Sequence, residues 1–99
     1  MKRERTHLTI ARQTEEGERK LLLDGRTAWA LYNLIEAGPK GCTPIDNPAP
    51  RWSAYIFKLR HDYDIAIETV VEPHGGPFAG RHGRYVLREP LRVIEREAA

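Results

Sequence analysis

The segment from residue 51 to residue 88 constrains the fold of this chain more than any other part. It reads RWSAYIFKLRHDYDIAIETVVEPHGGPFAGRHGRYVLR. Apolar residues recur at helical spacing over residues 50–61, and residues 65–72 then alternate between two faces, as in a strand. Residues 73–83 hold four glycines and two prolines, which disfavour regular structure, and residues 85–87 return as a second strand. The segment therefore predicts a helix followed by a β-hairpin with a long tip.

An earlier helix is predicted for residues 24–37. Asp24 is a favourable N-cap residue, because its carboxylate can accept hydrogen bonds from the free amides of the first turn. Gly38 and Pro39 end the helix. One buried stripe is formed by residues at i, i+3, i+4 and i+7, namely Ala28, Leu31, Tyr32 and Ile35. The matching stripe of helix 50–61 is Trp52, Ile56 and Leu59, and we expect Trp29 and Trp52 to join the two helices in the core.

The connection between the two helices is irregular. Residues 40–50 read KGCTPIDNPAP and contain three prolines, which leave space for one helical turn at most. Thr43 could cap such a turn with Pro44 as its first residue, and Pro50 could open the next helix in the same way.

The two ends of the chain are predicted to add extended structure. Residues 8–10 and 20–23 could form strands on either side of a turn at residues 14–18, as a hairpin or as one extended arm. The tail could add a further strand or dock on the domain. We therefore divide the chain into an N-terminal arm or hairpin (1–23), a central domain (24–90) and a C-terminal tail (91–99).

Composition limits the possible classes of protein. A chain of 99 residues has room for one small core, and 30% charged residues are ordinary for a globular protein. No apolar run reaches the roughly 20 residues that span a bilayer, so no membrane partner is expected. The basic N-terminus has no apolar run typical of a secretory signal. Cys42 is the only cysteine, which excludes an intrachain disulfide and fits a reduced cytoplasm.

The distribution of charge is more informative than the net charge of +2. Residues 51–61 contain three basic side chains and no acid, and residues 73–88 contain three arginines, two histidines and no acid. The acids lie between them, in the connecting turn and the first strand of the hairpin. A positive helix and a positive loop favour contact with a polyanion, although a mixed-charge surface could divide in this way by chance.

The order of elements resembles the winged helix-turn-helix family. The segments DGRTAWALYNLIEAGPKGCTP, PRWSAYIFKLRHDYDI and HGGPFAGRHGRYVL look like those of small bacterial winged-helix proteins of phage-like or mobile-element character. The resemblance covers residues 20–90. It implies an α+β fold in which a three-helix core, here with a shortened second helix, carries a β-hairpin wing. In that family the last helix usually enters the major groove of DNA, and the wing contacts the backbone or the minor groove.

Carried over by position, helix 50–61 would be the recognition helix and residues 72–84 a basic wing. Arginine can reach guanine with two hydrogen bonds and serine can pair with several base edges, whereas Lys58 and Arg60 suit phosphates. Phe78, at the expected tip of the wing, could stack on a base or contact a protein. The candidate DNA-binding residues are Arg51, Ser53, Ala54, Lys58, Arg60, His61, Arg81, His82 and Arg84.

Other chemistry is not supported by the residues present. Cys42 and the histidines lack the spacing of a structural zinc site, so we expect no metal. Cys42 has no local signature of a nucleophile and is expected to be a small buried thiol. The glycines of residues 75–80 are not followed by the lysine and helix of a phosphate-binding loop. We therefore expect no enzyme and no cofactor.

Two functions remain open at the level of sequence. The first is a small transcriptional regulator that binds double-stranded DNA. The second is a protein-interaction module, an adaptor or inhibitor of mobile-element or phage-like type, that contacts a protein partner through the wing. The shortened second helix and Phe78 favour the second. A homodimer is plausible in either case, since one helix and one wing offer little area for specific binding.

Overall fold

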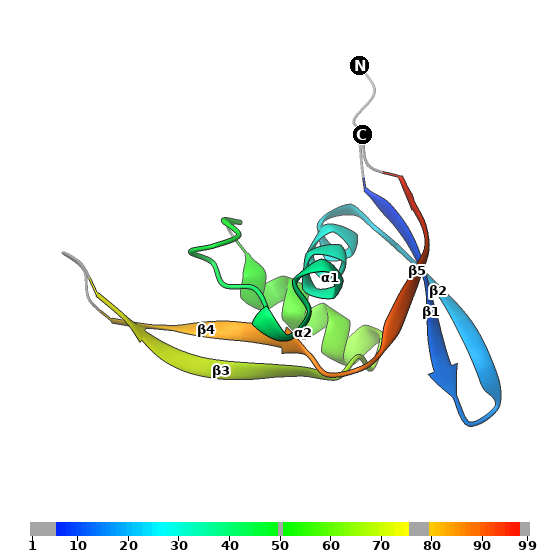
Figure 1. Cartoon of the computed structure of the whole chain (residues 1–99). Helices are drawn as coiled ribbons and strands as arrows, with labels where there is room; N and C mark the ends of the chain where they lie inside the picture. Colours follow the sequence, from blue (N-terminus) through cyan, green and yellow to red (C-terminus); the bar gives the residue numbers. More distant parts are fainter. Residues whose placement is uncertain (1–5, 50, 76–79, 98–99) are drawn as a thin grey trace, which may run out of the picture.

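The computed structural model describes residues 6–49, 51–75 and 80–97, apart from the side chain of His74. Two sheets flank two α-helices (Figure 1). The elements in chain order are β1 (His7–Thr14), β2 (Gly17–Asp24), α1 (Gly25–Ala37), a 3₁₀ turn (Gly38–Lys40), α2 (Trp52–Asp62), β3 (Ile67–His74), β4 (Gly80–Leu87) and β5 (Leu91–Glu97). None of the described helices is long and apolar enough to cross a membrane.

Helix α1 begins and ends where the sequence predicts. Gly38 ends it in a left-handed conformation, with φ of 58°, and its amide donates a hydrogen bond to the carbonyl of Leu34. Asp24 lies at the N-cap position, but its side chain makes no capping hydrogen bond. The buried stripe is also rotated from the predicted one, because sheets lie on two sides of the helix. Its buried residues are Ala28, Ala30, Leu31 and Leu34, while Tyr32 and Ile35 are half-buried.

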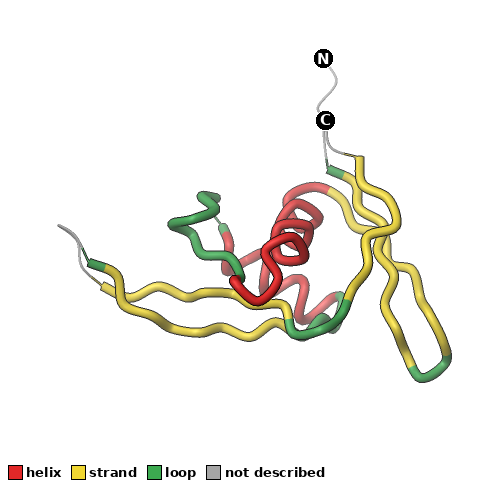
Figure 2. Tube along the Cα trace, viewed as in Figure 1, coloured by secondary structure: helices red, strands yellow, loops and turns green. Residues whose placement is uncertain are grey.

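Beyond the 3₁₀ turn, the segment between α1 and α2 is a loop (Figure 2), and residues 43–47 form one hydrogen-bonded turn within it. The Thr43 hydroxyl accepts a hydrogen bond from the Asp46 amide at 2.9 Å, and the Thr43 carbonyl accepts one from the Asn47 amide at 2.9 Å. Thr43 thus caps the turn, as predicted. Pro48 cannot continue the turn, because it lacks an amide proton. The described part of the chain accordingly contains two α-helices, and the expected three-helix core is not found.

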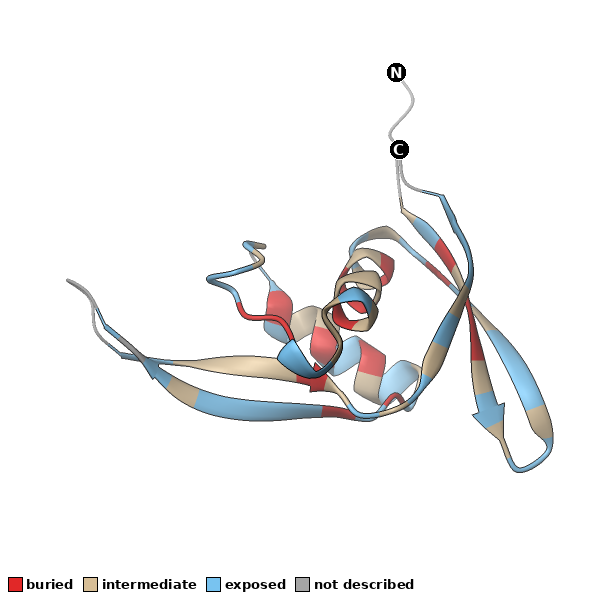
Figure 3. Ribbon diagram, viewed as in Figure 1, coloured by how far each residue is buried: buried red, intermediate tan, exposed pale blue. Residues whose placement is uncertain are grey.

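Helix α2 runs one residue beyond its predicted end, and its predicted stripe is confirmed. Trp52, Ile56 and Leu59 are all buried. The Trp52 ring lies 5.4 Å from the Trp29 ring and 6.0 Å from the Tyr85 ring, so it joins both helices and the β3–β4 hairpin. Pro50 lies outside the described residues. The buried residues gather on the facing sides of α1 and α2 and along β1 (Figure 3).

The β3–β4 hairpin is held against the chain that precedes α2. Cys42 forms an antiparallel bridge with Tyr85, in which each amide donates to the other's carbonyl at 2.9 and 2.8 Å. Gly41 makes this approach possible, because a Cβ atom there would lie 2.5 Å from the Tyr85 carbonyl oxygen. Cys42 is fully buried, as predicted, and burial raises the pKa of its thiol to about 11.

The ends of the chain form one three-stranded antiparallel sheet in the order β2-β1-β5. Leu8, Ile10 and Leu23 of the hairpin are buried in the core, and the tail forms β5 on the other side of β1. Arg12 joins this sheet to the rest of the molecule. Its guanidinium donates to both carboxylate oxygens of Glu89, at 2.5 and 2.7 Å, and to the carbonyls of Tyr63 and Asp64.

Candidate nucleic-acid interface

The outward face of α2 is the most continuous candidate surface. It lies opposite the buried stripe of Trp52, Ile56 and Leu59, and no described element covers it. Arg51, at the N-cap, and Lys58 form no ion pair within the described residues, although Asp62, the last residue of α2, lies one helical turn after Lys58. The residues of this face are exposed except for the half-buried Ala54, and they are Arg51, Ser53, Ala54, Phe57, Lys58 and His61.

Phe57 was not among the residues that the sequence predicted for this surface. Its side chain is 62% exposed, and its ring lies 4.1 Å from the ring of His61 one helical turn later. Position 57 is 140° around the helix from the buried Trp52, so the helical spacing in the sequence already indicated that Phe57 faces solvent. The DNA-contact residues predicted from the sequence were polar or small, and the prediction therefore missed this exposed aromatic side chain.

Arg60 lies at the side of α2 and points to the hairpin. Its guanidinium donates to the carbonyl of Ile67 at 3.1 and 2.6 Å and to the hydroxyl of Thr69 at 2.8 Å. These contacts satisfy three of its hydrogen-bond donors and connect α2 to β3. The side chain is therefore engaged within the protein, unlike Lys58, which was assigned the same phosphate-binding role.

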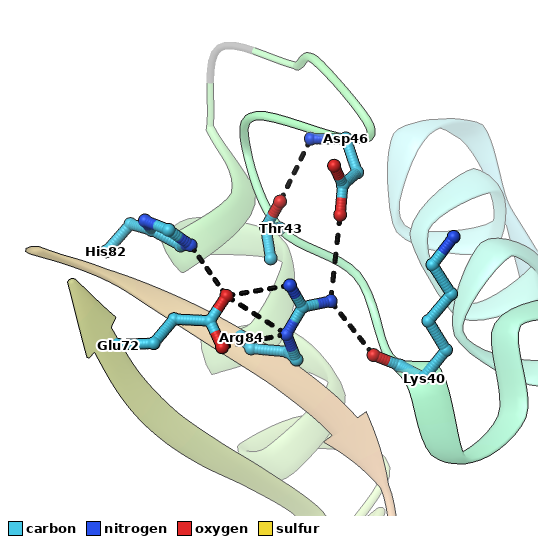
Figure 4. Close-up of polar contacts among 6 residues, drawn as sticks. All are labelled: Lys40, Thr43, Asp46, Glu72, His82 and Arg84. Carbon is cyan, nitrogen blue, oxygen red and sulfur yellow. Dashed lines mark hydrogen bonds and ion pairs between the residues drawn. The ribbon is translucent and has the colours of Figure 1, made fainter. Parts of the chain in front are cut away.

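Two basic residues of the wing, His82 and Arg84, are paired with one acid of the neighbouring strand, Glu72 (Figure 4). In the β3–β4 register Glu72 lies opposite His82, and Arg84 is its diagonal neighbour. Glu72 Oε1 lies 2.7 Å from Arg84 Nη2 and 2.9 Å from His82 Nε2. The hydrogen bonds from Arg84 and then from His82 lower the pKa of the Glu72 carboxyl to about 2.

Arg84 also reaches the turn that replaces the second helix. Its Nη1 donates to the Lys40 carbonyl at 3.0 Å and lies 3.6 Å from Asp46 Oδ2 (Figure 4). Arg84 therefore links three segments, namely β3, the 3₁₀ turn and the Thr43–Asn47 turn. The Glu72 carboxylate raises the pKa of the Arg84 guanidinium, which keeps it charged.

These pairs correct the expected separation of charge. Arg88 likewise pairs with Glu68, at 2.6 Å, so two of the three arginines of residues 73–88 are neutralised by acids of β3. The acids lie beside the arginines because the strands are antiparallel, although the two groups are separate along the chain. Arg81 is exposed near the tip end of β4 and has no ion pair among the described residues. Phe78 lies outside the described residues.

The structure thus separates the sequence-predicted site residues into two groups. The first group faces solvent on α2 or at the end of β4, and consists of Arg51, Ser53, Ala54, Lys58, His61 and Arg81. The second group is engaged in contacts within the protein, and consists of Arg60, His82 and Arg84. No group of three or more histidine, cysteine or acidic side chains suited to a metal ion occurs in the part of the chain that the structure describes.

Comparison with known protein families agrees with this arrangement. Two helices, the bridge at Cys42 and a β-hairpin that follows the last helix define a winged-helix fold of the α+β class. A family model described as a winged helix domain matches residues 20–97. The chain therefore belongs to the winged helix domain family. Comparisons with curated proteins and with solved structures gave no significant match.

Proposed function

We propose that this protein binds double-stranded DNA through the outward face of α2 and the end of the β3–β4 hairpin. The observation that carries the proposal is the exposed face of α2, where Arg51 and Lys58 have no ion pair within the described residues and where the helix carries one acid, Asp62, at its last residue. Membership of the winged helix family supports it, because that fold in general places such a helix against DNA. We further propose a small transcriptional regulator in the cytoplasm, without catalytic activity.

The chemistry of the face suggests a division of roles. Lys58 and Arg81 suit phosphate oxygens, and Arg51, at the first turn of α2, could contact a phosphate or a guanine edge. Ser53 can exchange hydrogen bonds with base edges. Ala54 and Phe57 present apolar surface, which is suited to thymine methyl groups in the major groove. If Arg51, Lys58 and Arg81 each contact a phosphate, we expect a modest salt dependence of binding, with a slope of roughly −2 to −3 in a plot of log K against log salt.

A salt titration of duplex binding tests the proposal. We expect binding at low salt that weakens as salt rises, and we expect Arg51→Ala to weaken it. Arg19→Ala is the matched control, since Arg19 is also an exposed arginine but lies on β2 in the other sheet. Undetectable binding at low salt, or equal effects of the two substitutions, would contradict the proposal.

The alternative function, a protein-interaction module, is favoured by a different observation. The pairing of Glu72 with Arg84 and His82 reduces the positive charge of the wing, and the apolar side chains Phe57 on α2 and Val71 on β3 are exposed. Val71 is 60% exposed on β3. Failure to bind any duplex at low salt, together with retained folding, would favour this alternative over the DNA-binding role.

A further inference from the structure

One edge of the three-stranded sheet has the features of an edge strand that is suited to pairing with another strand. β2 lies at the edge of the sheet beside β1 (Figure 1), and it pairs with β1 without a bulge from Gly17 to Asp24. Leu22 on this strand is 74% exposed, the largest value among the exposed large hydrophobic residues of the described chain. A regular edge strand with an exposed apolar side chain is a template for strand pairing.

The turn of the hairpin determines which backbone groups point to the free edge. Thr14 and Gly17 flank a two-residue loop, and residues in that position exchange both of their backbone hydrogen bonds with each other. Because the pattern alternates along the strand, every second residue of β2 directs its amide and carbonyl away from β1. These residues are Glu18, Lys20, Leu22 and Asp24, although the Asp24 carbonyl, at the N-cap of α1, accepts the first hydrogen bond of that helix.

The same residues carry side chains on the solvent face of the sheet. Lys20, Leu22 and Asp24 are exposed, whereas Leu21 and Leu23 pack against the core on the other face. The edge therefore combines outward backbone groups with the sequence lysine, leucine and aspartate at alternate positions. When two copies of this strand lie antiparallel, the lysine of each copy faces the aspartate of the other on both sides of the leucine. The pattern is therefore self-complementary.

We propose that a second copy of this chain pairs along this edge, with β2 antiparallel to the partner's β2 about a two-fold axis at Leu22. In this register the two Leu22 side chains are in contact, and each Lys20 lies opposite an Asp24. Centring the axis on Arg19 or Lys20 places two like cations opposite each other. Centring it on Leu21 places Glu18 opposite Asp24. The register centred on Leu22 is the one that combines two opposite-charge pairs with contact between the two exposed leucines.

The other edge of the sheet is less suited to this role. The pairing of β5 with β1 shifts between Thr9 and Ile10, which inserts Ile94 as an extra residue in β5. A bulge twists an edge strand and interrupts the alternation of its outward hydrogen-bonding groups. The homodimer contact is accordingly assigned to β2 and not to the tail. Each three-stranded sheet becomes half of a continuous six-stranded sheet in the dimer.

Cysteine cross-linking tests both the contact and its register. With diamide as oxidant, we expect Leu22→Cys chains to form a disulfide-linked dimer, and we expect mixed Lys20→Cys and Asp24→Cys chains to form a heterodimer. Lys20→Cys alone should not cross-link, because its two copies would lie about 13 Å apart, at about 3.3 Å for each of four residues, which is too far for a disulfide. The unaltered chain gives the background, since Cys42 is fully buried.

Sedimentation equilibrium provides an independent measurement on chains without added cysteines. We expect the wild-type protein to dimerise and Leu22→Lys to raise the dissociation constant at least about tenfold, by removing the apolar contact and placing two lysines together. Ile45→Lys is the matched control, because Ile45 is 57% exposed in the turn before α2. Circular dichroism confirms that each variant is folded. A monomer at every concentration up to the solubility limit, or cross-linking of Lys20→Cys alone, would overturn the proposal.

Discussion

Glu72 and Arg84 form a cross-strand ion pair in which both carboxylate oxygens accept hydrogen bonds from the guanidinium. Arg84 Nε lies 3.1 Å from Oε1 and 3.0 Å from Oε2, and Nη2 lies 2.7 Å from Oε1. The same guanidinium bonds to the carbonyl of Lys40. A residue that the sequence suggested for DNA contact therefore connects the wing to the segment before α2, so its substitution should act on folding stability.

Replacing Glu72 with Gln should remove a pH-dependent part of the stability. The pKa of Glu72 is lowered from 4.5 to about 2 in the folded protein, so the unfolded chain binds more protons between these pH values. The stabilisation is complete above pH 4.5 and is lost as pH falls toward 2. We expect the difference in unfolding free energy between wild type and Glu72→Gln to shrink over that range in chemical denaturation. Glu15→Gln, in the exposed hairpin turn, controls for the loss of one carboxylate, and a difference independent of pH would contradict the assignment.

Arg60 and Lys58 should affect different properties, although they are two residues apart on α2. Arg60→Ala removes hydrogen bonds to Ile67 and Thr69 and should cost about 1–2 kcal/mol of stability. Lys58→Ala should leave stability within about 0.5 kcal/mol of wild type but reduce the salt slope of DNA binding by about 1. Thermal unfolding and the salt titration measure the two effects. A loss of stability in Lys58→Ala together with a smaller salt slope in Arg60→Ala would contradict these roles.

Phe57→Ala should alter base preference and leave the fold intact. Because its side chain is 62% exposed, the substitution should change stability by no more than about 0.5 kcal/mol. If Phe57 packs on a thymine methyl, replacing that thymine by uracil should weaken wild-type binding about fourfold. This factor corresponds to the roughly 0.8 kcal/mol that burial of a methyl-sized group contributes. The variant should bind the two duplexes equally. A wild-type protein that binds DNA without distinguishing thymine from uracil would exclude this contact while leaving the DNA-binding role in place.

Gly41→Ala should destabilise the contact between the wing and the core. The added Cβ would lie 2.5 Å from the Tyr85 carbonyl oxygen, and Gly41 has a φ of 69°, which disfavours side chains. We expect a loss of more than about 1 kcal/mol in chemical denaturation. Gly38→Ala is the matched control. It has a similar φ of 58°, but no atom lies within 4 Å of its Cβ position, so it reports the backbone strain without the clash.

The order and type of the elements were determined largely by the sequence. Helical spacing located α1 and α2 to within a few residues, and the alternation after α2 together with the glycine-rich segment located the β3–β4 hairpin. Thr43, followed by Pro44, identified the cap of the short turn. These features are local, since each depends on residues within one or two turns or strands, and local patterns can therefore be read without knowledge of the tertiary structure.

The exposure of the charged residues was decided only by the tertiary structure. Whether Arg84 faces DNA or Glu72 depends on the register of β3 against β4, and a shift of one residue would move every side chain to the other face. Arg12 and Glu89, which are 77 positions apart, meet because the N-terminal hairpin folds back beside the end of β4. The sequence alone determined a helix and a hairpin rich in basic residues. Tertiary pairing decided which of those charges remain available to a partner, because an arginine already bonded to a carboxylate no longer offers its full charge.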